Sequence, residues 1–235
     1  MGNEGQQHLK ILRKLARGTR SLLTENHVVP LWKEVHLDDI TFTVSPYVAH
    51  SMNDCYGAWA KNSVGDIVDM ILQSLEAIVF VHELGIVHRD LCKVNYVVQW
   101  HPESLLTMRL PLCRPRAFLI DFETAIEFPP ELPVEQRLLT GHPMKDYQRL
   151  LPPEVASGTP YDPFKADIWQ LANSFSDFKT TVAEIDAILE QMLEADVSRR
   201  LSAAEARDQL AAVVHGMPAT TLLIPPFVLQ SSDAF

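Results

Sequence analysis

A run of consecutive residues near the middle of the chain constrains the fold more than any other feature. It reads Gly-Ile-Val-His-Arg-Asp-Leu-Cys-Lys-Val-Asn from Gly85 to Asn95. Residues 66–84 precede it, and their apolar positions keep the three- and four-residue spacing of one helix face. Gly85 stands where a helix ends in a left-handed residue, and the strand-like Tyr96-Val97-Val98 comes next. We therefore expect a long helix, a polar loop and a strand in succession.

The polar loop resembles the catalytic loop of protein kinases, written H-R-D-L-x-x-x-N, with its Asp and Asn five positions apart. Asp90 and Asn95 keep this spacing. The resemblance implies that Asp90 accepts the proton of the substrate hydroxyl and that Asn95 is a ligand of Mg²⁺. It also implies that His88 stacks in the core and that Arg89 braces the activation segment.

One position of this loop departs from the Ser/Thr kinase pattern. The family places a Lys two residues after the catalytic Asp, where it neutralises the phosphate in transfer, and this chain has Cys92 there. Lys93 is the neighbouring residue, and our hypothesis is that its ammonium group neutralises the phosphate in transfer instead. A shift of one residue in a tight loop redirects the side chain, so the hypothesis depends on the local geometry.

A second match, Asp121-Phe122-Glu123, stands where the family has D-F-G, at the end of an apolar strand-like run. An Asp in this place is well positioned to carry Mg²⁺ between phosphates, so Asp121 is a predicted metal ligand and Phe122 a predicted structural residue. Glu123 in place of Gly restricts the backbone conformations of the segment. Small-molecule kinases similar to choline and aminoglycoside phosphotransferases also write I-D-F-E. A structural Asp that caps a turn is a further alternative.

Three more residues resemble positions that hold the kinase fold together. Glu154 ends Leu-Pro-Pro-Glu, similar to the A-P-E that closes the activation segment, and Asp167 begins Asp-Ile-Trp, similar to the D-x-W of helix αF. Arg200 lies in a stretch that resembles D-P-x-x-R-P-T-A. In the family the Glu and the Arg form a buried ion pair, which the resemblance implies for Glu154 and Arg200. Ordinary surface charges on helices are the alternative.

The run Ser45-Pro46-Tyr47-Val48 stands where the resemblance places the hinge that receives adenine. A hinge binds through backbone groups, so the predicted contacts are the Pro46 carbonyl as acceptor and the Val48 N–H as donor. Val97 would form the floor of the adenine site. ATP and Mg²⁺ are therefore the expected cofactors, with simple core packing as the alternative for these apolar residues.

The predicted elements follow the order helix, two strands, long helix, loop with short strands, long loop and further helices. Strands are predicted at 28–35 and 40–44, and the later helices at 165–175, 182–193 and 202–215. This order resembles a protein kinase from its αC helix onward, an α+β fold with a mainly α-helical C-lobe and a few N-lobe strands. We expect a partial N-lobe with the hinge over residues 1–48, the C-lobe over 49–216 and a C-terminal tail over 217–235.

Among protein kinases the resemblance is closest to the fungal-type kinases of mushroom-forming fungi. The shared features are the run Pro-Tyr-Asp-Pro-Phe-Lys, here Pro160 to Lys165, and an H-R-D loop that carries Cys and Lys. The resemblance covers nearly the whole sequence.

The printed sequence has no G-x-G-x-x-G run and no strand-like stretch before its first helix to carry the Lys that grips nucleotide phosphates. Three interpretations are open. The first is a Ser/Thr protein kinase whose N-lobe front is supplied elsewhere, for example by a partner. The second is a non-catalytic pseudokinase that serves as a binding or scaffold module. The third, a small-molecule phosphotransferase, is disfavoured by the long segment that ends in Pro-Pro-Glu.

Charge and hydropathy indicate the kind of partner. Twenty basic and thirty acidic residues give a net charge of −10 without a Lys/Arg-rich block, which argues against nucleic acid and anionic membranes. The most apolar long window, residues 67–87, carries too many polar side chains to span a bilayer. Three cysteines without C-x-x-C spacing and a polar N-terminus without a secretory signal favour an intracellular location, cytoplasmic or nuclear. The expected partner is a protein.

Overall fold

The computed structural model describes residues 3–38, 40–48, 50–56, 60, 63–100 and 114–228. Within these ranges the chain is mixed α and β, with seven α-helices and four small antiparallel sheets. Much of the connection predicted between residues 99 and 116, and the end of the predicted C-terminal tail, lie outside the described residues.

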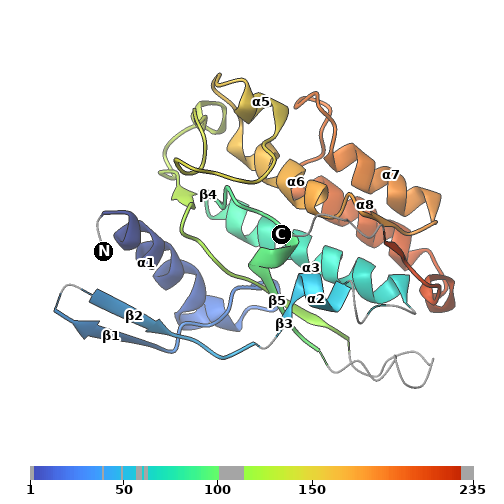
Figure 1. Ribbon diagram of the computed structural model, residues 1–235, viewed down its shortest axis with the longest axis horizontal. Coiled ribbons are helices and arrows are strands. Elements are labelled where there is room, and N and C mark those ends of the chain that lie inside the picture. Colours follow the sequence, from blue (N-terminus) through green and yellow to red (C-terminus); the bar gives the residue numbers. More distant parts are fainter. Residues whose placement is uncertain are drawn as a thin grey trace.

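An N-terminal helix and a β-hairpin pack together at one end of the molecule (Figure 1). The helix α1 covers Asn3–Ala16, and the 3-10 helix η1 covers Gly18–Leu22. The hairpin consists of β1 (Lys33–Leu37) and β2 (Ile40–Val44), which pair antiparallel. Arg13 Nε donates to Glu34 Oε1 at 2.9 Å and Arg17 donates to the same oxygen at 3.0 Å. These contacts tie α1 to the polar face of the hairpin.

The first predicted strand is wrong at its start. The sequence predicts Val28–Val35, whereas the strand covers Lys33–Leu37, and Val28 forms only an isolated bridge with Leu119. Pro30 explains the difference, because proline has no N–H to donate to a strand ladder. The second predicted strand has the expected bounds, Ile40–Val44.

The long helix α3 covers Val64–Glu83 and runs through the centre of the molecule (Figure 1). It begins two residues before the predicted start because the Ser63 side chain accepts a hydrogen bond from the Asp66 N–H and caps the first turn. Gly85 follows with φ of 72°, the left-handed conformation that the sequence predicts. A Cβ added at Gly85 would lie 3.3 Å from the Phe128 carbonyl oxygen, so the position also requires a small residue.

Two small sheets flank the loop that follows α3. One has the order β3-β5-β6, and the other pairs β4 with β7. Their bounds are His50–Ser51 for β3, Ile86–Val87 for β4, Tyr96–Gln99 for β5, Arg116–Leu119 for β6 and Ile126–Glu127 for β7. The short helices α2 (Met52–Asp54) and η3 (Lys93–Asn95) precede α3 and β5 respectively. The loop is thereby fixed at both ends by strand pairing.

The second half of the described chain is mainly helical and forms the opposite end of the molecule (Figure 1). Its elements are η4 (Val134–Gln136), α5 (Pro153–Ala156), α6 (Pro163–Ser174), β8 (Phe178–Lys179), α7 (Ala183–Met192) and α8 (Ala203–His215). Helix α6 starts two residues early because Pro163 occupies its first turn and Asp162 caps it. The predicted capping box at Ser202 and Glu205 is present.

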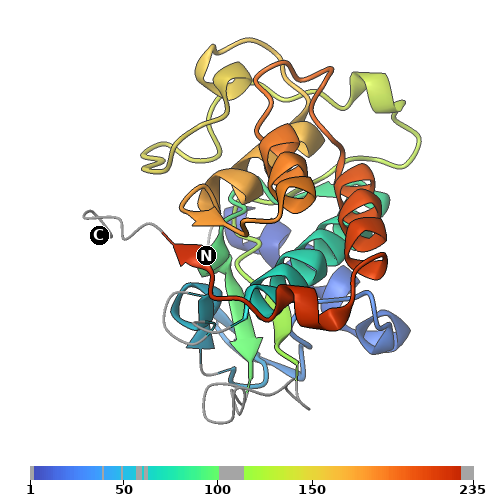
Figure 2. The same ribbon diagram turned by 90° about the vertical axis from the view of Figure 1, so that its right-hand side faces the viewer.

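The chain after α8 returns alongside α3 (Figure 2). It forms the 3-10 helix η5 (Ala219–Leu222) and the strand β9 (Phe227–Val228), which pairs with β8. The Val64 N–H at the start of α3 donates to the Ile224 carbonyl at 2.9 Å, and the Leu222 side chain is buried. This part of the predicted tail therefore packs against the helices.

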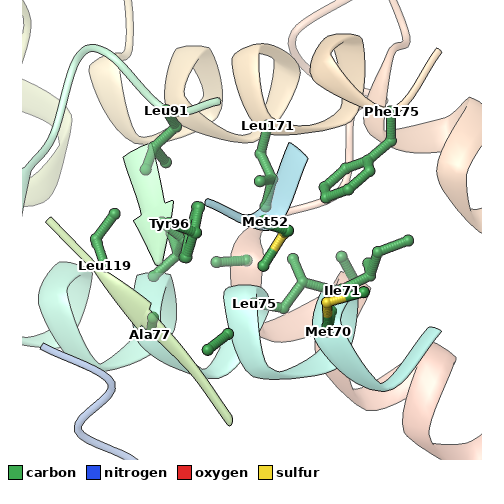
Figure 3. Packing of buried hydrophobic residues seen from close by; sticks show 14 of the residues in the cluster. Met52, Met70, Ile71, Leu75, Ala77, Leu91, Tyr96, Leu119, Leu171 and Phe175 are labelled. Carbon is green, nitrogen blue, oxygen red and sulfur yellow. The ribbon is translucent and has the colours of Figure 1, made fainter. Parts of the chain in front are cut away.

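The main core lies between α3 and α6 (Figure 3). Met70, Ile71 and Leu75 project from α3 toward Leu171 and Phe175 at the other side of the core. Leu91, Tyr96 and Leu119 continue the same cluster toward the loop after β4 and toward the sheet. The loop that carries Asp90 is thus anchored on a packed core. Among the helices of the described chain, none is both long and apolar enough to cross a membrane.

Candidate active site

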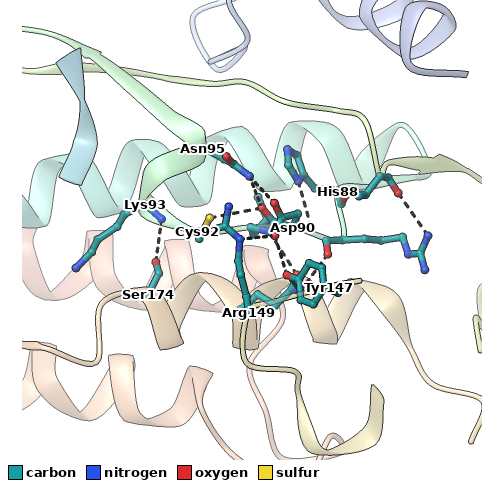
Figure 4. Close-up of polar contacts among 12 residues, drawn as sticks. His88, Asp90, Cys92, Lys93, Asn95, Tyr147, Arg149 and Ser174 are labelled. Atoms are coloured by element: carbon teal, nitrogen blue, oxygen red, sulfur yellow. Dashed lines mark hydrogen bonds and ion pairs between the residues drawn. The ribbon is translucent and has the colours of Figure 1, made fainter. Parts of the chain in front are cut away.

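The carboxylate of Asp90 is bound by side chains from distant parts of the chain (Figure 4). Asn95 Nδ2 donates to Asp90 Oδ2 at 2.9 Å, and the Tyr147 hydroxyl donates to Oδ1 at 2.7 Å. Arg149 Nε lies 2.8 Å from Oδ1, and the Asp90 side chain is only 10% exposed. One cation and two neutral donors therefore replace much of the water that a carboxylate would otherwise bind.

Asp167 on α6 holds the first residues of the loop. Its fully buried carboxylate accepts the backbone N–H of His88 at 2.8 Å and the backbone N–H of Arg89 at 2.7 Å. His82 Nε2 of α3 lies 2.9 Å from the same carboxylate. Asp167 thereby joins α3, α6 and the loop.

His88 connects the loop to the strand end that carries Asp121. Its Nδ1 accepts the Asp90 N–H at 3.3 Å, so the ring proton is on Nε2, which donates to the Ile120 carbonyl at 2.9 Å. The ring packs against Phe122 with 5.0 Å between centroids, and both side chains are buried. Burial lowers the pKa of His88, which keeps the neutral ring that this bonding pattern requires.

Arg89 and Asp121 both have left-handed backbones, with φ of 70° and 64°. Such conformations cost free energy for residues with a Cβ and concentrate at functional sites. The Arg89 side chain donates to the His142 carbonyl at 3.0 Å and approaches the Thr124 carbonyl at 3.5 Å. Arg89 therefore contacts the segment after Asp121 through backbone carbonyl groups.

Lys93 does not lie beside Asp90. Its ammonium donates to Asp177 Oδ2 at 2.7 Å and sits 4.3 Å from the centroid of the Tyr56 ring. Figure 4 shows its side chain pointing away from the Asp90 carboxylate. The structure thus places the Lys93 side chain in a structural contact with the segment after α6.

A cavity of about 300 Å³ lies between α1, the segment 45–48 and the end of β6. Val48 and Val97, the predicted nucleotide-binding residues, both line it, as do Pro46 and Asp121. Within the described chain no backbone hydrogen bond engages the Pro46 carbonyl or the Val48 N–H. The size matches the lower end of small-molecule sites.

Asn95 and Asp121 are held next to each other by the backbone. The Ile120 N–H donates to the Asn95 carbonyl at 3.0 Å, which places Asp121 one residue away from this bond. Asn95 Nδ2 donates to Asp90, so Oδ1 is the atom of this amide that would bind a metal. Within the described residues, no group of three or more His, Cys, Asp or Glu side chains is arranged so that it could hold a metal ion. Two oxygen donors fit Mg²⁺, which takes its other ligands from phosphates and water.

Glu154 and Arg200 are joined by two parallel hydrogen bonds. Arg200 Nη1 donates to Glu154 Oε1 at 2.5 Å, and Nη2 donates to Oε2 at 3.0 Å. Arg200 is almost completely buried, and it also donates to the carbonyls of Glu194 and Lys165. All three nitrogens of the Arg200 guanidinium thus donate to oxygen atoms. These bonds compensate the loss of water that a buried cation suffers.

Sequence reasoning missed three residues, namely Tyr147 and Arg149, which contact Asp90, and Gln170, which contacts Tyr147. Gln170 on α6 donates to the Tyr147 hydroxyl at 2.9 Å and to the Arg89 carbonyl at 3.0 Å, and its Oε1 accepts the Leu91 N–H at 3.3 Å. Burial raises the pKa of Tyr147, and its bond to Asp90 adds to this, so the phenol stays protonated as a donor. The available signal was Gln170 itself, a polar residue on the buried face of a helix.

Comparison with known proteins relates the chain to protein kinases. Over 103 residues it is 31% identical to the serine/threonine-protein kinase ppk8 of Schizosaccharomyces pombe. Over 96 residues it is 32% identical to the probable serine/threonine-protein kinase RTK1 of Saccharomyces cerevisiae. These matches cover 44% and 41% of this chain but only 17% and 13% of the two relatives. No family model matches the chain. The similarities support a protein kinase-like relationship.

Proposed function

We propose that this chain is a protein kinase-like domain that binds Mg²⁺–ATP and transfers a phosphoryl group to a Ser or Thr hydroxyl of a protein. The observation that carries the proposal is the linkage of three predicted residues. Asn95 binds the carboxylate of Asp90 through its side chain and the strand end before Asp121 through its carbonyl. A candidate base and two candidate metal ligands are thus linked, and one of these ligands, Asp121, lines the cavity of about 300 Å³.

Each residue has a defined part in this proposal. The Pro46 carbonyl and the Val48 N–H would bind the adenine edge, and Val97 would lie under the ring. Asn95 Oδ1 and the Asp121 carboxylate would hold Mg²⁺, which when bound neutralises charge on the phosphates. Asp90 would orient the acceptor hydroxyl and take its proton as the bond to phosphorus forms.

Phosphoryl transfer with an Asp90→Asn variant tests the proposal. The purified chain would be incubated with Mg²⁺ and radiolabelled ATP in the presence of a Ser/Thr peptide library. We expect label in peptides with the wild type and at least a 100-fold lower rate with Asp90→Asn, because the amide cannot accept the proton. Equal labelling by the two proteins would contradict a base role for Asp90. Label on a small hydroxylated compound alone would favour a small-molecule phosphotransferase.

The finer resemblance to fungal-type kinases is part of the proposal, and the run Pro160–Lys165 supports it. Asp162 caps α6 by accepting the N–H groups of Phe164 and Lys165 at 2.9 and 3.3 Å. The Tyr161 hydroxyl donates to the Gly141 carbonyl at 3.2 Å. This run therefore connects α6 to the segment that also carries Tyr147 and Arg149.

A non-catalytic scaffold is the second candidate, favoured by one surface of the hairpin. Register places Val35 opposite Phe42 and Leu37 opposite Ile40, all on the face opposite to the Glu34 contacts with α1. Leu37, Ile40 and Phe42 are 59%, 44% and 51% exposed. An exposed apolar strand pair favours a protein partner that covers it or adds strands to it. Binding of Mg²⁺–ATP without transfer to any acceptor would favour this candidate.

A further inference from the structure

The structure brings a cation to Asp90 from an unexpected part of the chain. Arg149 lies in the segment between β7 and α5, and its Nε contacts Asp90 Oδ1 at 2.8 Å. We propose that Arg149 supplies the positive charge for the transferred phosphoryl group that Ser/Thr kinases obtain from a Lys in the catalytic loop. This inference rests on the proposed phosphotransfer and identifies a further residue of the same site.

The catalytic loop itself has no cation in the required place. Cys92 stands at the family's Lys position, and burial raises the pKa of its thiol to about 11, so it is uncharged at neutral pH. Lys93 is held by Asp177 and the Tyr56 ring, with 14% of its side chain exposed. Turning Lys93 toward Asp90 would break both contacts and leave Asp177 without its ion pair.

Arg149 has the geometry for two simultaneous contacts. A guanidinium carries five N–H donors in a planar fork, and Nε of Arg149 is within ion-pair distance of Asp90. Its side chain is 42% exposed, and within the described residues its terminal amino groups make no further ion pair. These groups are therefore available to phosphoryl oxygens, which planar guanidinium groups bind well.

The position of Arg149 is set by its neighbour Tyr147. Gln170 on α6 fixes the Tyr147 hydroxyl, and that hydroxyl binds the same Asp90 oxygen as Arg149. The guanidinium consequently reaches Asp90 only while the segment around residues 147–149 is docked on α6. Docking of this segment on α6 would then bring the positive charge of Arg149 to the site beside Asp90.

The step balances without any additional reactant. The acceptor oxygen forms a bond to the γ-phosphorus of ATP, the bond from that phosphorus to the ADP oxygen breaks, and the hydroxyl proton goes to Asp90. Arg149 keeps its protons and stabilises the negative charge on the transferred group, where a pre-positioned cation lowers the barrier most. It would also hold the Asp90 carboxylate in place.

The test compares Arg149→Ala, Arg149→Lys and the double variant Arg149→Ala with Cys92→Lys. Arg199→Ala is the control, because Arg199 is 72% exposed and has only a 3.9 Å contact with Glu194. We expect Arg149→Ala to lower kcat about 100-fold with little change in the KM for ATP, as for other removed charge-stabilising donors. Arg149→Lys and the double variant should each recover roughly tenfold of that loss, because a cation near the transferred group suffices for part of the effect.

A binding measurement adds a readout that does not depend on turnover. Calorimetry would compare the affinity for Mg²⁺–ADP with that for Mg²⁺–ADP plus tetrafluoroaluminate, an anion that takes the place of the transferred phosphoryl group. We expect Arg149→Ala to keep the affinity for Mg²⁺–ADP and to lose most of the gain from tetrafluoroaluminate.

Each other outcome has a defined meaning. The role of Arg149 would be overturned if Arg149→Ala changed neither kcat nor the gain in affinity that tetrafluoroaluminate gives. Faster transfer by this variant would also overturn it, because Arg149 would then be a group that blocks Asp90. Wild-type protein that binds Mg²⁺–ADP without any tetrafluoroaluminate gain would also overturn it. Folded wild-type protein that neither binds Mg²⁺–ADP nor transfers phosphate would overturn the proposed function, and this inference with it.

Discussion

Glu154 in α5 and Arg200 before α8 are joined by a two-pronged ion pair with N–O distances of 2.5 and 3.0 Å. Arg200 is almost fully buried, and the Glu154 side chain is 12% exposed. The pair fixes the end of the segment that carries Tyr147 and Arg149 to the helices α6–α8. It therefore links global stability to the position of groups at Asp90.

Replacing Glu154 by Gln should destabilise the chain strongly, because Arg200 would keep a buried charge without its carboxylate. We expect a loss of about 3–5 kcal/mol in the free energy of unfolding. Urea denaturation followed by circular dichroism measures this value. The matched control is Glu190→Gln, which removes the exposed partner of Lys179 and should cost less than about 1 kcal/mol. Equal losses in the two variants would argue against Glu154–Arg200 as a structural brace.

Stability should also fall on the acid side of pH 6.5. Burial lowers the pKa of His88 and His27 from 6.5, and the charge of Arg116 lowers the His27 pKa further. The unfolded chain then binds protons first as the pH falls through 6.5, so folding is favoured above this value and loses free energy below it.

Denaturation at several pH values between 5 and 8 checks this expectation. The variant His27→Gln should show a weaker decline of stability below pH 6.5 than the wild type, because one of the two titrating groups is gone. His36→Gln is the control, since His36 is exposed on β1. A constant free energy of unfolding across this pH range would contradict the role assigned to the buried imidazoles.

The geometry of the loop between β4 and β5 could be predicted because its residues are close in sequence. His88, Asp90 and Asn95 lie in one short loop between β4 and β5. Their spacing in the sequence therefore determines which of their side chains can contact each other. The pairing of Glu154 with Arg200 came from family resemblance, and the structure contains the ion pair. Both features could be predicted because they depend on residues of recognisable motifs and not on the course of the chain elsewhere.

The direction of long side chains could not be predicted in this way. Lys93 turns to Asp177, which is 84 positions away, and Tyr147 reaches Asp90 from 57 positions away. The segment around Tyr147 has no helical or strand period, so no sequence pattern indicates which face it presents. Tertiary contacts decide these orientations, and for that reason Arg149 was not among the predicted site residues.

Gln170→Leu should weaken the loop that holds Asp90. The side chain of Gln170 bonds the Leu91 N–H, the Arg89 carbonyl and the Tyr147 hydroxyl. A Leu would remove these three bonds and leave the Tyr147 hydroxyl only its bond to Asp90. We expect a loss of roughly 2 kcal/mol in the free energy of unfolding and faster amide hydrogen exchange at Leu91. Gln148→Leu, at an exposed position, is the control and should change neither value. Unaltered exchange at Leu91 in Gln170→Leu would show that Gln170 does not hold the loop.

Asp121→Asn tests the metal site directly. The carboxylate lines the cavity, and an amide in its place is a weaker ligand for Mg²⁺. We expect the variant to bind ATP without the extra affinity that Mg²⁺ gives the wild type. Asp208→Asn, on the exposed side of α8, is the matched control and should keep the full magnesium effect.

Thermal unfolding of the wild-type chain with ATP, with and without Mg²⁺, measures the central claim that the cavity beside Asp121 is a nucleotide site. We predict that ATP raises the Tm, that Mg²⁺ raises it further, and that Asp121→Asn removes only the magnesium-dependent part. Well-folded wild-type protein whose Tm does not change in either condition would contradict a nucleotide role for this site.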